Sequence, residues 1–295
     1  MNINEIENCK DGDQVENLTG WVSSIRDHGG LTFIDLRDFT ASIQLVFDKS
    51  GEVNTKLKNE YYISINGVFK KRDDSLINKK VFLGDSEIEV TNLTVINESK
   101  TLPFQIENEI DTDENIRLKY RYLDLRREPM KINIMTRSNT FKSIRSIMNQ
   151  LNIYEIDTPT LIKSTPEGAK DFLVPSRKSP GSFYALPQSP QMYKQLFMMS
   201  GFPNYYQIAK CYRDEDSRKD RQPEFTQLDL EFSDANPSVV KSNIETIIKF
   251  VFSDAYDCKV NTPFKSLSYN DAINLYGTDK PDMRIAETLI DITEI

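Results

Sequence analysis

The stretch from Tyr205 to Phe232 carries the side chains of this chain that are best suited to chemistry. Two strand-like runs flank a loop that is rich in charges of both signs. In the second run Gln227, Asp229 and Glu231 alternate with apolar residues, so they share one face of a strand. Such a face is costly to bury dry, which predicts a wet, polar site. Arg213 ends the first run and can hold a phosphate or carboxylate with its planar fork of donors.

An exposed hairpin with a salt-bridged tip is the alternative interpretation, because runs of charge usually mark solvated surface. The order of the residues favours a functional site instead. YRDED, then a basic loop, then RQPEFTQLD resemble motif 2 of the class II aminoacyl-tRNA synthetases, and this version resembles the aspartyl-tRNA synthetases.

The resemblance implies an aspartate–tRNA ligase, which makes aspartyl-adenylate from aspartate and ATP and then charges tRNA(Asp). Whether tRNA(Asn) is charged as well stays open. Magnesium is implied, with its ligands beyond Ile295. Arg213 would be the catalytic residue, holding the α-phosphate, with Lys194 facing the side-chain carboxylate of aspartate and Asp229 its ammonium. The resemblance implies three sets of contacts. Aspartate would be bound by Glu167, Ser189, Gln191, Lys194, Arg213 and Asp229. ATP would be bound by Arg213, Asp214, Glu215, Gln222 and Phe225, with Phe225 stacked on the adenine, and the acceptor end of tRNA would meet Ser217 and Arg218.

The helix predicted after Ser189 would present part of this site. Ser189 can cap the helix, Pro190 fits its first turn, and Gly201 can end it in a left-handed conformation. Gln191 and Lys194 share a face three residues apart, at a helix end that favours anions. Either residue alone would by default be exposed, but the remaining residues of the helix are mostly apolar, so we expect the helix to be largely buried.

The N-terminal part of the chain is predicted to be all-β. Five short runs are rich in Val, Ile, Phe, Tyr and Thr and are separated by turn signals such as His28-Gly29-Gly30. These runs are Gln14–Val22, Leu31–Leu36, Ser42–Phe47, Tyr61–Phe69 and Glu87–Ile96, and Lys56–Tyr61 adds a short helix. The pattern is typical of an OB-fold, a small barrel that binds oligonucleotides on one face. A barrel without a ligand is the alternative.

The string GWVSSIRDHGGLTFIDLRD resembles the anticodon-binding domain of aspartyl-, asparaginyl- and lysyl-tRNA synthetases. The resemblance implies that Phe33 stacks on an anticodon base, while Arg26 and Gln44 supply charge and base-edge hydrogen bonds. Phe33 alternates with Asp35 along its run, which favours the barrel surface over the core. Ser23 and Ser24 stand where relatives often carry Arg, which weakens the expected contacts to the RNA backbone.

A helix over Ile134–Leu151, then a strand over Tyr154–Leu161 with Pro159 as its stop, resembles motif 1, which implies a homodimer interface at Pro159. Ahead of it, the spacing of Leu118, Tyr122 and Leu125 predicts another helix. Basic residues are dense between Arg117 and Arg145. They form either a local RNA-facing patch or a solvated helix surface.

Composition restricts the classes of function. The 295 residues suffice for about two domains, and 38% of them are hydrophobic. No apolar run reaches membrane-spanning length and no signal peptide is evident, so we expect a cytoplasmic protein. Cys9, Cys211 and Cys258 are too far apart for a zinc motif and predict free thiols, and the single histidine excludes a multi-His metal site. A net charge of −8 argues against a general nucleic-acid coat.

The predicted fold is α+β. We expect an OB-fold anticodon-binding domain over residues 1–103, a hinge over 104–125, and an antiparallel class II catalytic domain over 126–295. That domain is expected to be incomplete, with motifs 1 and 2 only, because no GxGxGxxR-like string for motif 3 occurs. Two alternatives stay open: a non-catalytic tRNA-binding paralogue, and a class II enzyme of relaxed Asp/Asn or other specificity.

Overall fold

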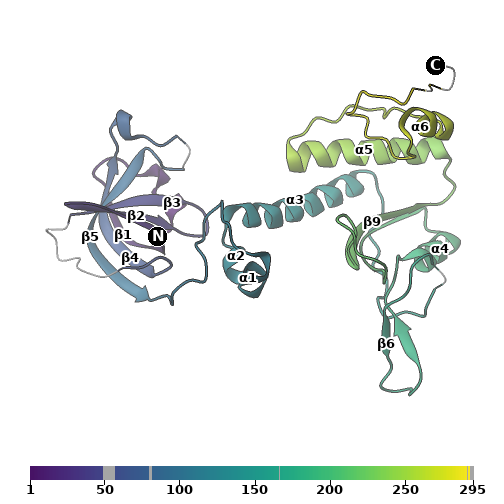
Figure 1. The fold of residues 1–295 in the computed structure, drawn as a ribbon, viewed down its shortest axis with the longest axis horizontal. Helices are drawn as coiled ribbons and strands as arrows, with labels where there is room; N and C mark the ends of the chain where they lie inside the picture. The colour runs from purple at the N-terminus through teal and green to yellow at the C-terminus, as the bar shows by residue number, and fades with distance from the viewer. Residues whose placement is uncertain (49–56, 80–81, 166, 291, 293–295) are drawn as a thin grey trace. The chain divides into compact units, whose positions relative to one another are not determined.

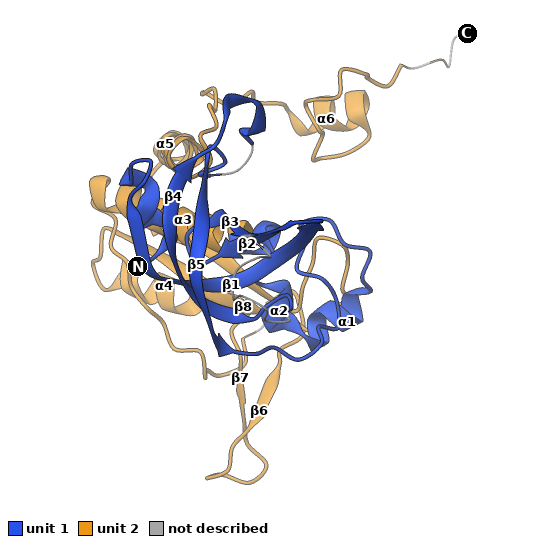
Figure 2. Ribbon diagram, turned by 90° about the vertical axis from the view of Figure 1, so that its left-hand side faces the viewer, with its two compact units in different colours: residues 1–131 blue, residues 132–295 orange. Residues whose placement is uncertain are grey.

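The computed structural model describes residues 1–48, 57–79, 82–165, 167–290 and 292. They form two compact units, residues 1–131 and residues 132–295, which Figure 2 shows in different colours. The domain boundaries at 103 and 125 stay a prediction. No helix within the described ranges is long and apolar enough to cross a membrane.

Unit 1 contains the five-stranded barrel that the sequence predicted (Figure 1). Its strands are β1 (Gln14–His28), β2 (Leu31–Arg37), β3 (Ser42–Asp48), β4 (Tyr62–Lys71) and β5 (Ser86–Asn97), closed in the order β1-β2-β3-β5-β4. β3 pairs parallel with β5, and the other pairs are antiparallel. The short helix predicted at 56–61 is absent from residues 57–61, which include a turn with Glu60 at φ 67°, and Lys56 lies outside the described residues.

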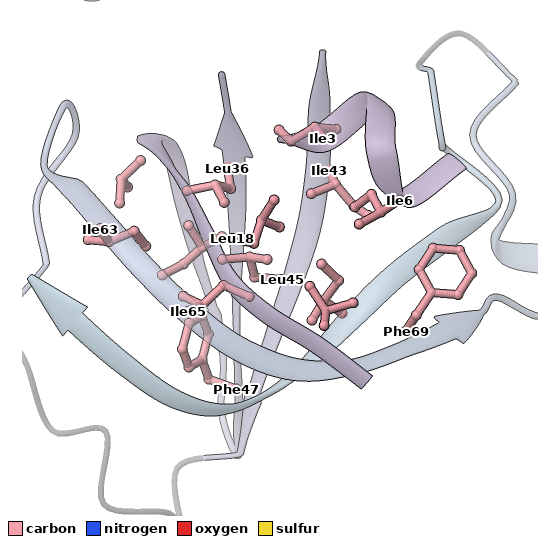
Figure 3. Packing of buried hydrophobic residues seen from close by; sticks show 14 of the residues in the cluster. Ile3, Ile6, Leu18, Leu36, Ile43, Leu45, Phe47, Ile63, Ile65 and Phe69 are labelled. Carbon is pink, nitrogen blue, oxygen red and sulfur yellow. The ribbon is translucent and has the colours of Figure 1, made fainter. Parts of the chain in front are cut away.

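The barrel core follows from the period of two along each strand. Leu18, Leu45 and Ile65 point inward and are 0–1% exposed (Figure 3). A 3-10 helix, η1 (Ile3–Asn8), adds Ile3 and Ile6 to the same core. The alternation leaves the intervening residues of each strand outside, which is where a binding face can form.

The helix predicted around Tyr122 is divided into two short helices, α1 (Glu114–Lys119) and α2 (Arg121–Asp124), at Tyr120. Asp124 is fully buried and pairs with Arg121 at 2.5 Å and with Arg127 at 2.8 Å. Arg126 pairs with the buried Glu60 of the barrel unit. Part of the basic stretch therefore neutralises internal carboxylates, as a buried charge requires, and does not form a free cationic patch.

Unit 2 is built around a hairpin of β8 (Asn204–Tyr212) and β9 (Glu224–Phe232) (Figure 1). Leu228, Leu230 and Phe232 pack on the core of α3 (Glu128–Gln150) and α5 (Pro237–Tyr256). On the other face of the hairpin lies α4 (Gln191–Met199), whose Lys194 contacts β9. The unit also contains a small hairpin, β6 (Leu173–Pro175) with β7 (Phe183–Ala185), and helix α6 (Tyr269–Tyr276). The two predicted faces of β9 are thus confirmed.

The strand predicted over Tyr154–Leu161 is wrong. This segment forms a single parallel bridge, between Glu155 and Tyr206 of β8. Pro159 has no N–H to donate to a ladder, so regular pairing cannot continue through it.

Two expectations for α4 are also wrong. Its apolar side chains are not largely buried: Met192 is 40% exposed, Leu196 48% and Met199 82%, and Lys194 is the one buried residue of this helix. Only one side of α4 meets the hairpin, so residues off that side lie in solvent. Ser189 does not cap the helix either, because Pro190 is the N-cap and makes no side-chain cap bond.

The predicted end of α4 is confirmed. Gly201 has φ 90°. Its N–H donates to Met198 O at 3.1 Å, and that of Phe202 donates to Phe197 O at 3.1 Å. This pair of bonds is a Schellman motif, which requires a left-handed residue and so favours glycine.

Candidate active site and candidate RNA-binding face

A buried ion pair joins α4 to β9. Lys194 Nζ lies 2.9 Å from Asp229 Oδ1 and 3.3 Å from Glu231 Oε2, and the side chains of Lys194 and Asp229 are 11% and 13% exposed. Burial alone would lower the pKa of Lys194, but its hydrogen bonds to Asp229 and Glu231 outweigh burial and raise it. Lys194 therefore stays cationic at neutral pH, with one N–H beyond those two bonds.

Asp229 keeps one oxygen free for a further partner. By hydrogen-bond geometry its Oδ2 is buried and has no donor within the described part of the chain, although Asp229 is close enough to the Tyr205 hydroxyl for burial and their interaction together to raise the pKa of Tyr205. A buried carboxylate oxygen without a donor is costly. The pair thus offers an ammonium to an anionic group and a carboxylate oxygen to a cationic one, side by side.

Glu167 is held at the start of α4. Ser189 Oγ donates to Glu167 Oε2 at 3.0 Å, and Thr165 Oγ1 donates to Oε1 at 3.2 Å. The hydroxyl expected to cap the helix therefore orients a carboxylate instead. Gln191 lies half-buried in the first turn of the same helix.

Arg213 follows β8 directly. Its N–H donates to Pro223 O at 2.9 Å, and its guanidinium carbon lies 5.0 Å from the ring centre of Phe225. This cation–π contact orients the guanidinium and covers one face of the ring that was predicted to stack on adenine. The next residue, Asp214, donates its N–H to Lys170 O at 3.0 Å.

Sequence reasoning missed Cys211 as part of this region. Its side chain is fully buried, and Sγ is 3.2 Å from Gln227 Oε1. Burial raises the pKa of the thiol to about 11, and the charges of Arg213, Asp229, Glu167 and Lys194 also act on it. The period of two along β8 could have found Cys211, because it shares the face of Asp229.

The remaining predicted residues of this region are exposed. Asp214, Glu215, Gln222, Ser217 and Arg218 lie in the loop between β8 and β9. Within that loop Glu215 Oε1 is 3.9 Å from an Arg221 nitrogen, and Arg218 and Arg221 exchange backbone hydrogen bonds. Pro159 is exposed too. Within the described part of the chain, none of these side chains makes a hydrogen bond or an ion pair with Lys194 or Asp229.

The outer face of the barrel brings the predicted RNA contacts together. Arg26 and Phe33 are register partners on β1 and β2. Arg26 donates to Asp35 with two bonds of 2.7 Å and to Gln44 Oε1 at 3.3 Å. Asp35 thus neutralises the charge that Arg26 was expected to supply. Phe33 is half-buried, with the His28 ring 5.6 Å away.

A cavity of about 210 Å³ lies beside this cluster and is lined by Arg26, Asp35, Gln44, Arg72 and Asn78 among others. Arg72 was missed in the sequence. Its Nε is 3.2 Å from Glu87 Oε2, and it donates to Gln44 Oε1 at 3.4 Å. The basic run Lys70-Lys71-Arg72 at the end of a strand was the available signal. The cavity combines amide, guanidinium and carboxylate groups, the types that read base edges.

Comparison with known proteins identifies both domains. The family model described as tRNA synthetases class II (D, K and N) matches residues 113–293, and an OB-fold nucleic acid binding domain matches residues 17–96. An aspartate–tRNA(Asp/Asn) ligase of Dictyoglomus turgidum is 50% identical over 283 residues, covering 94% of this chain and 48% of the relative. One of Treponema denticola is 48% identical, covering 90% and 46%. The chain therefore spans about half the length of the curated relatives it matches.

Solved structures share the fold. Asparaginyl-tRNA synthetase of Entamoeba histolytica in complex with asparaginyl-adenylate matches with a TM-score of 0.76 at 23% identity, covering 92% of this chain and 65% of that one. Aspartyl-tRNA synthetase of the same organism matches with a TM-score of 0.72 at 23% identity, covering 92% and 61%. Because the class II model matches well over half of the residues, the chain belongs to the class II tRNA synthetases of the aspartate, lysine and asparagine group.

Proposed function

We propose that this chain forms the amino-acid-binding and anticodon-binding parts of an aspartate–tRNA ligase. The observation that carries the proposal is the buried Lys194–Asp229 pair beside α4, with Glu167 held by Ser189 at the start of the same helix. Free aspartate has two carboxylates and one ammonium, and this set offers cations and carboxylates for both kinds of charge. Lys194 would meet the side-chain carboxylate, and the free oxygen of Asp229 would meet the ammonium.

The same geometry supports aspartate over the other amino acids of the group. Asparagine has a neutral amide where aspartate has a carboxylate, so the N–H of Lys194 that is not bonded to Asp229 or Glu231 would meet a neutral group instead of an anion. The lysine side chain would bring an ammonium against Lys194. Discrimination by an unpaired buried polar group is strong, so Lys194 is the residue that we expect to select the substrate.

In the first step an oxygen of the aspartate α-carboxylate attacks the α-phosphorus of ATP, and pyrophosphate leaves. In the second step a terminal ribose hydroxyl of tRNA attacks the carbonyl carbon of the adenylate, and AMP leaves. Both steps require placement and charge compensation. Arg213, held over Phe225 and anchored at Pro223, would donate to the α-phosphate as charge shifts there.

ATP would be held by Arg213 and Phe225, with Asp214, Glu215 and Gln222 from the exposed loop. The family is ATP-dependent and typically uses Mg²⁺, which would neutralise the triphosphate when bound. Among the residues described here no group of three or more His, Cys, Asp or Glu side chains is placed to hold a metal. These residues do not fit a metal site, so no step is assigned to the ion.

For the RNA partner we propose tRNA(Asp), with its anticodon on the barrel face of Phe33, Arg26 and Gln44 and its acceptor end at Ser217 and Arg218. The names of the relatives include tRNA(Asp/Asn), so tRNA(Asn) is a second acceptor to test. A homodimer through the exposed region of Pro159 is proposed with it, because Tyr154 and Leu161 nearby are 56% and 53% exposed. Such a ligase would act in the cytoplasm, where tRNA is charged.

The test is ATP–pyrophosphate exchange by the full-length natural protein with aspartate, asparagine or lysine. We expect exchange with aspartate alone. Exchange driven by asparagine or lysine would refute the assignment of Lys194. Charging of tRNA(Asn) and tRNA(Asp) transcripts with labelled aspartate then decides between the relaxed and the strict acceptor range.

A second candidate is a tRNA-binding protein without catalysis. It is favoured by one observation: the Arg26–Gln44–Arg72 cavity is complete within unit 1. Binding of an anticodon stem-loop without exchange for any amino acid would support this candidate.

A further inference from the structure

Gln188 is buried, carries no charge and was not among the predicted site residues. It is 2% exposed and immediately precedes Ser189 and α4. Its Nε2 donates to Ala169 O at 2.8 Å and to Asp171 Oδ1 at 2.6 Å, and its Oε1 accepts from Ala169 N–H at 3.0 Å. One carboxamide therefore pairs with both backbone groups of Ala169, as a strand partner would.

The segment that Gln188 holds is the segment that carries Glu167. Residues 167–171 belong to no helix or named strand, and their one backbone bridge is between Lys170 and Asp214. A segment with so little regular pairing has little stability of its own. Gln188 fixes its backbone, and the adjacent Ser189 fixes the Glu167 carboxylate at 3.0 Å.

We infer that Gln188 is a positioning residue for aspartate: it holds residues 167–171 so that Glu167 faces the ammonium of the substrate. The inference rests on the proposed function. Ser189, which holds Glu167, lies directly before α4, and Lys194 in the early part of α4 contacts Asp229. Both carboxylates therefore lie against the start of one helix, where an ammonium can meet them. Without Gln188 the segment loses the three hydrogen bonds of Ala169 and Asp171, and Glu167 is held less firmly.

We expect a substitution of Gln188 to change the KM for aspartate and to leave the KM for ATP unchanged. Arg213 has an anchor that does not involve Gln188 or residues 167–171, its N–H to Pro223 O at 2.9 Å. A general loss of stability would instead change the KM for aspartate, the KM for ATP and kcat together. The change in the KM for aspartate relative to the change in the KM for ATP therefore separates positioning from structural support.

The first experiment is pyrophosphate exchange by the full-length natural protein and its Gln188→Ala variant. We expect the KM for aspartate to rise about tenfold, on the order of one lost hydrogen bond. The KM for ATP and kcat should stay within about twofold. Gln195→Ala is the control, because Gln195 is exposed on α4, and it should leave both KM values unchanged. An unchanged KM for aspartate, or an equal rise for ATP, would overturn the inference.

A second pair of variants exchanges the hydrogen-bond donor and acceptor between residues 188 and 171 and leaves the size of both side chains nearly unchanged. Gln188→Glu alone brings a second carboxylate against Asp171 and should impair aspartate binding at least as much as Gln188→Ala. Adding Asp171→Asn restores a donor opposite the new acceptor, while Ala169 O stays without the donor that Gln188 supplied, so the combined variant should recover part of the loss. A combined variant no better than Gln188→Glu would count against the role of this contact.

Hydrogen exchange on residues 1–295 gives an answer that does not depend on activity. In the natural sequence the Ala169 amide is bonded to Gln188 and should exchange slowly. In Gln188→Ala the peptide covering 167–172 should exchange faster while peptides from β8 and β9 stay unchanged. If the natural protein shows no aspartate-dependent pyrophosphate exchange, the proposed function fails, and this measurement still decides whether Gln188 fixes the segment. Equal exchange in both proteins would show that it does not.

Discussion

Replacing Lys194 by Met should destabilise unit 2 far more than replacing Lys210 by Met. Both lysines pair with a carboxylate of β9, Lys194 with Asp229 at 2.9 Å and Lys210 with Glu224 at 2.7 Å. The first pair is 11% and 13% exposed, and the second is 54% and 53% exposed. The two substitutions are matched in chemistry, and each removes the partner of a β9 carboxylate, Lys194 from α4 and Lys210 from β8, so burial is the main variable that differs.

The magnitude follows from that difference. Removing one partner of a buried pair costs about 3–5 kcal/mol. Because Lys194 and Asp229 keep some exposure, we expect the lower end, about 2–3 kcal/mol. Met keeps most of the aliphatic stem of Lys, so little packing is lost. For the exposed Lys210 pair we expect about 0.2–1 kcal/mol.

Urea unfolding of residues 1–295 can resolve the two units separately. The chain has one tryptophan, Trp21, and it lies in β1 of unit 1. Tryptophan fluorescence therefore follows unit 1, while hydrogen exchange of the α3 and α5 peptides follows unit 2. Two units need not unfold together, so the fluorescence midpoint is an internal control that neither variant should shift.

The pH of the experiment follows from the sign of the pKa shift. The pKa of Lys194 is raised in the fold above its ordinary value of 10.5. Its contribution is therefore complete below that value and is lost as the pH rises through the folded pKa, so pH 7 measures all of it. Equal losses for Lys194→Met and Lys210→Met would refute the reasoning. In the full-length protein the same Lys194 variant should raise the aspartate requirement by roughly 2–5 kcal/mol.

Three further outcomes are expected. Phe33→Ala should weaken binding of an anticodon stem-loop by about 1–3 kcal/mol in a titration and leave pyrophosphate exchange unchanged; unaltered affinity would contradict it. Iodoacetamide at pH 8 should modify the exposed Cys258 first and the buried Cys211 only after unfolding, as mass spectrometry of each peptide can show. The pKa of Asp38 is lowered, since hydrogen bonds led by Ile3 N–H outweigh burial. Its contribution to stability is present above an unfolded pKa of about 3.9 and is lost as the pH falls below that value. The urea midpoint followed by Trp21 fluorescence should therefore fall less on acidification in Asp38→Asn than in the natural sequence.

The elements that depend on local pattern were predicted well. Leu228, Leu230 and Phe232 alternate with polar residues, and they do face the α3 and α5 core. The five barrel runs became β1 to β5 because a period of two, closed by turn residues, is readable within a few residues. Gly201 ended α4 for a similarly local reason, since only the left-handed conformation satisfies its motif.

What could not be predicted depends on residues that are distant in sequence. Asp229 is 35 residues from Lys194, and nothing local tells that the lysine is already paired before a substrate arrives. Ser189 could cap α4 or orient Glu167, and only the position of the 167–171 segment decides between them. Arg26 and Arg121 were treated as free charges, whereas Asp35 and Asp124 neutralise them. Motifs identify residue types at a site, but their partners come from the packing of separate segments.

The face of the β8–β9 hairpin that carries Cys211 and Asp229 shows how a costly buried group can serve binding. Cys211 is fully buried there, and one oxygen of Asp229 is buried without a donor. Leaving that oxygen unmet costs about 1–3 kcal/mol, and an apolar residue at 229 would remove the cost. It would also remove an acceptor that an incoming ammonium could use. Lys194 prevents the opposite failure, because without it Asp229 would be a buried carboxylate that has lost its nearest cationic partner. The pair thus keeps a carboxylate buried and half satisfied, which a small zwitterion with a second carboxylate can complete.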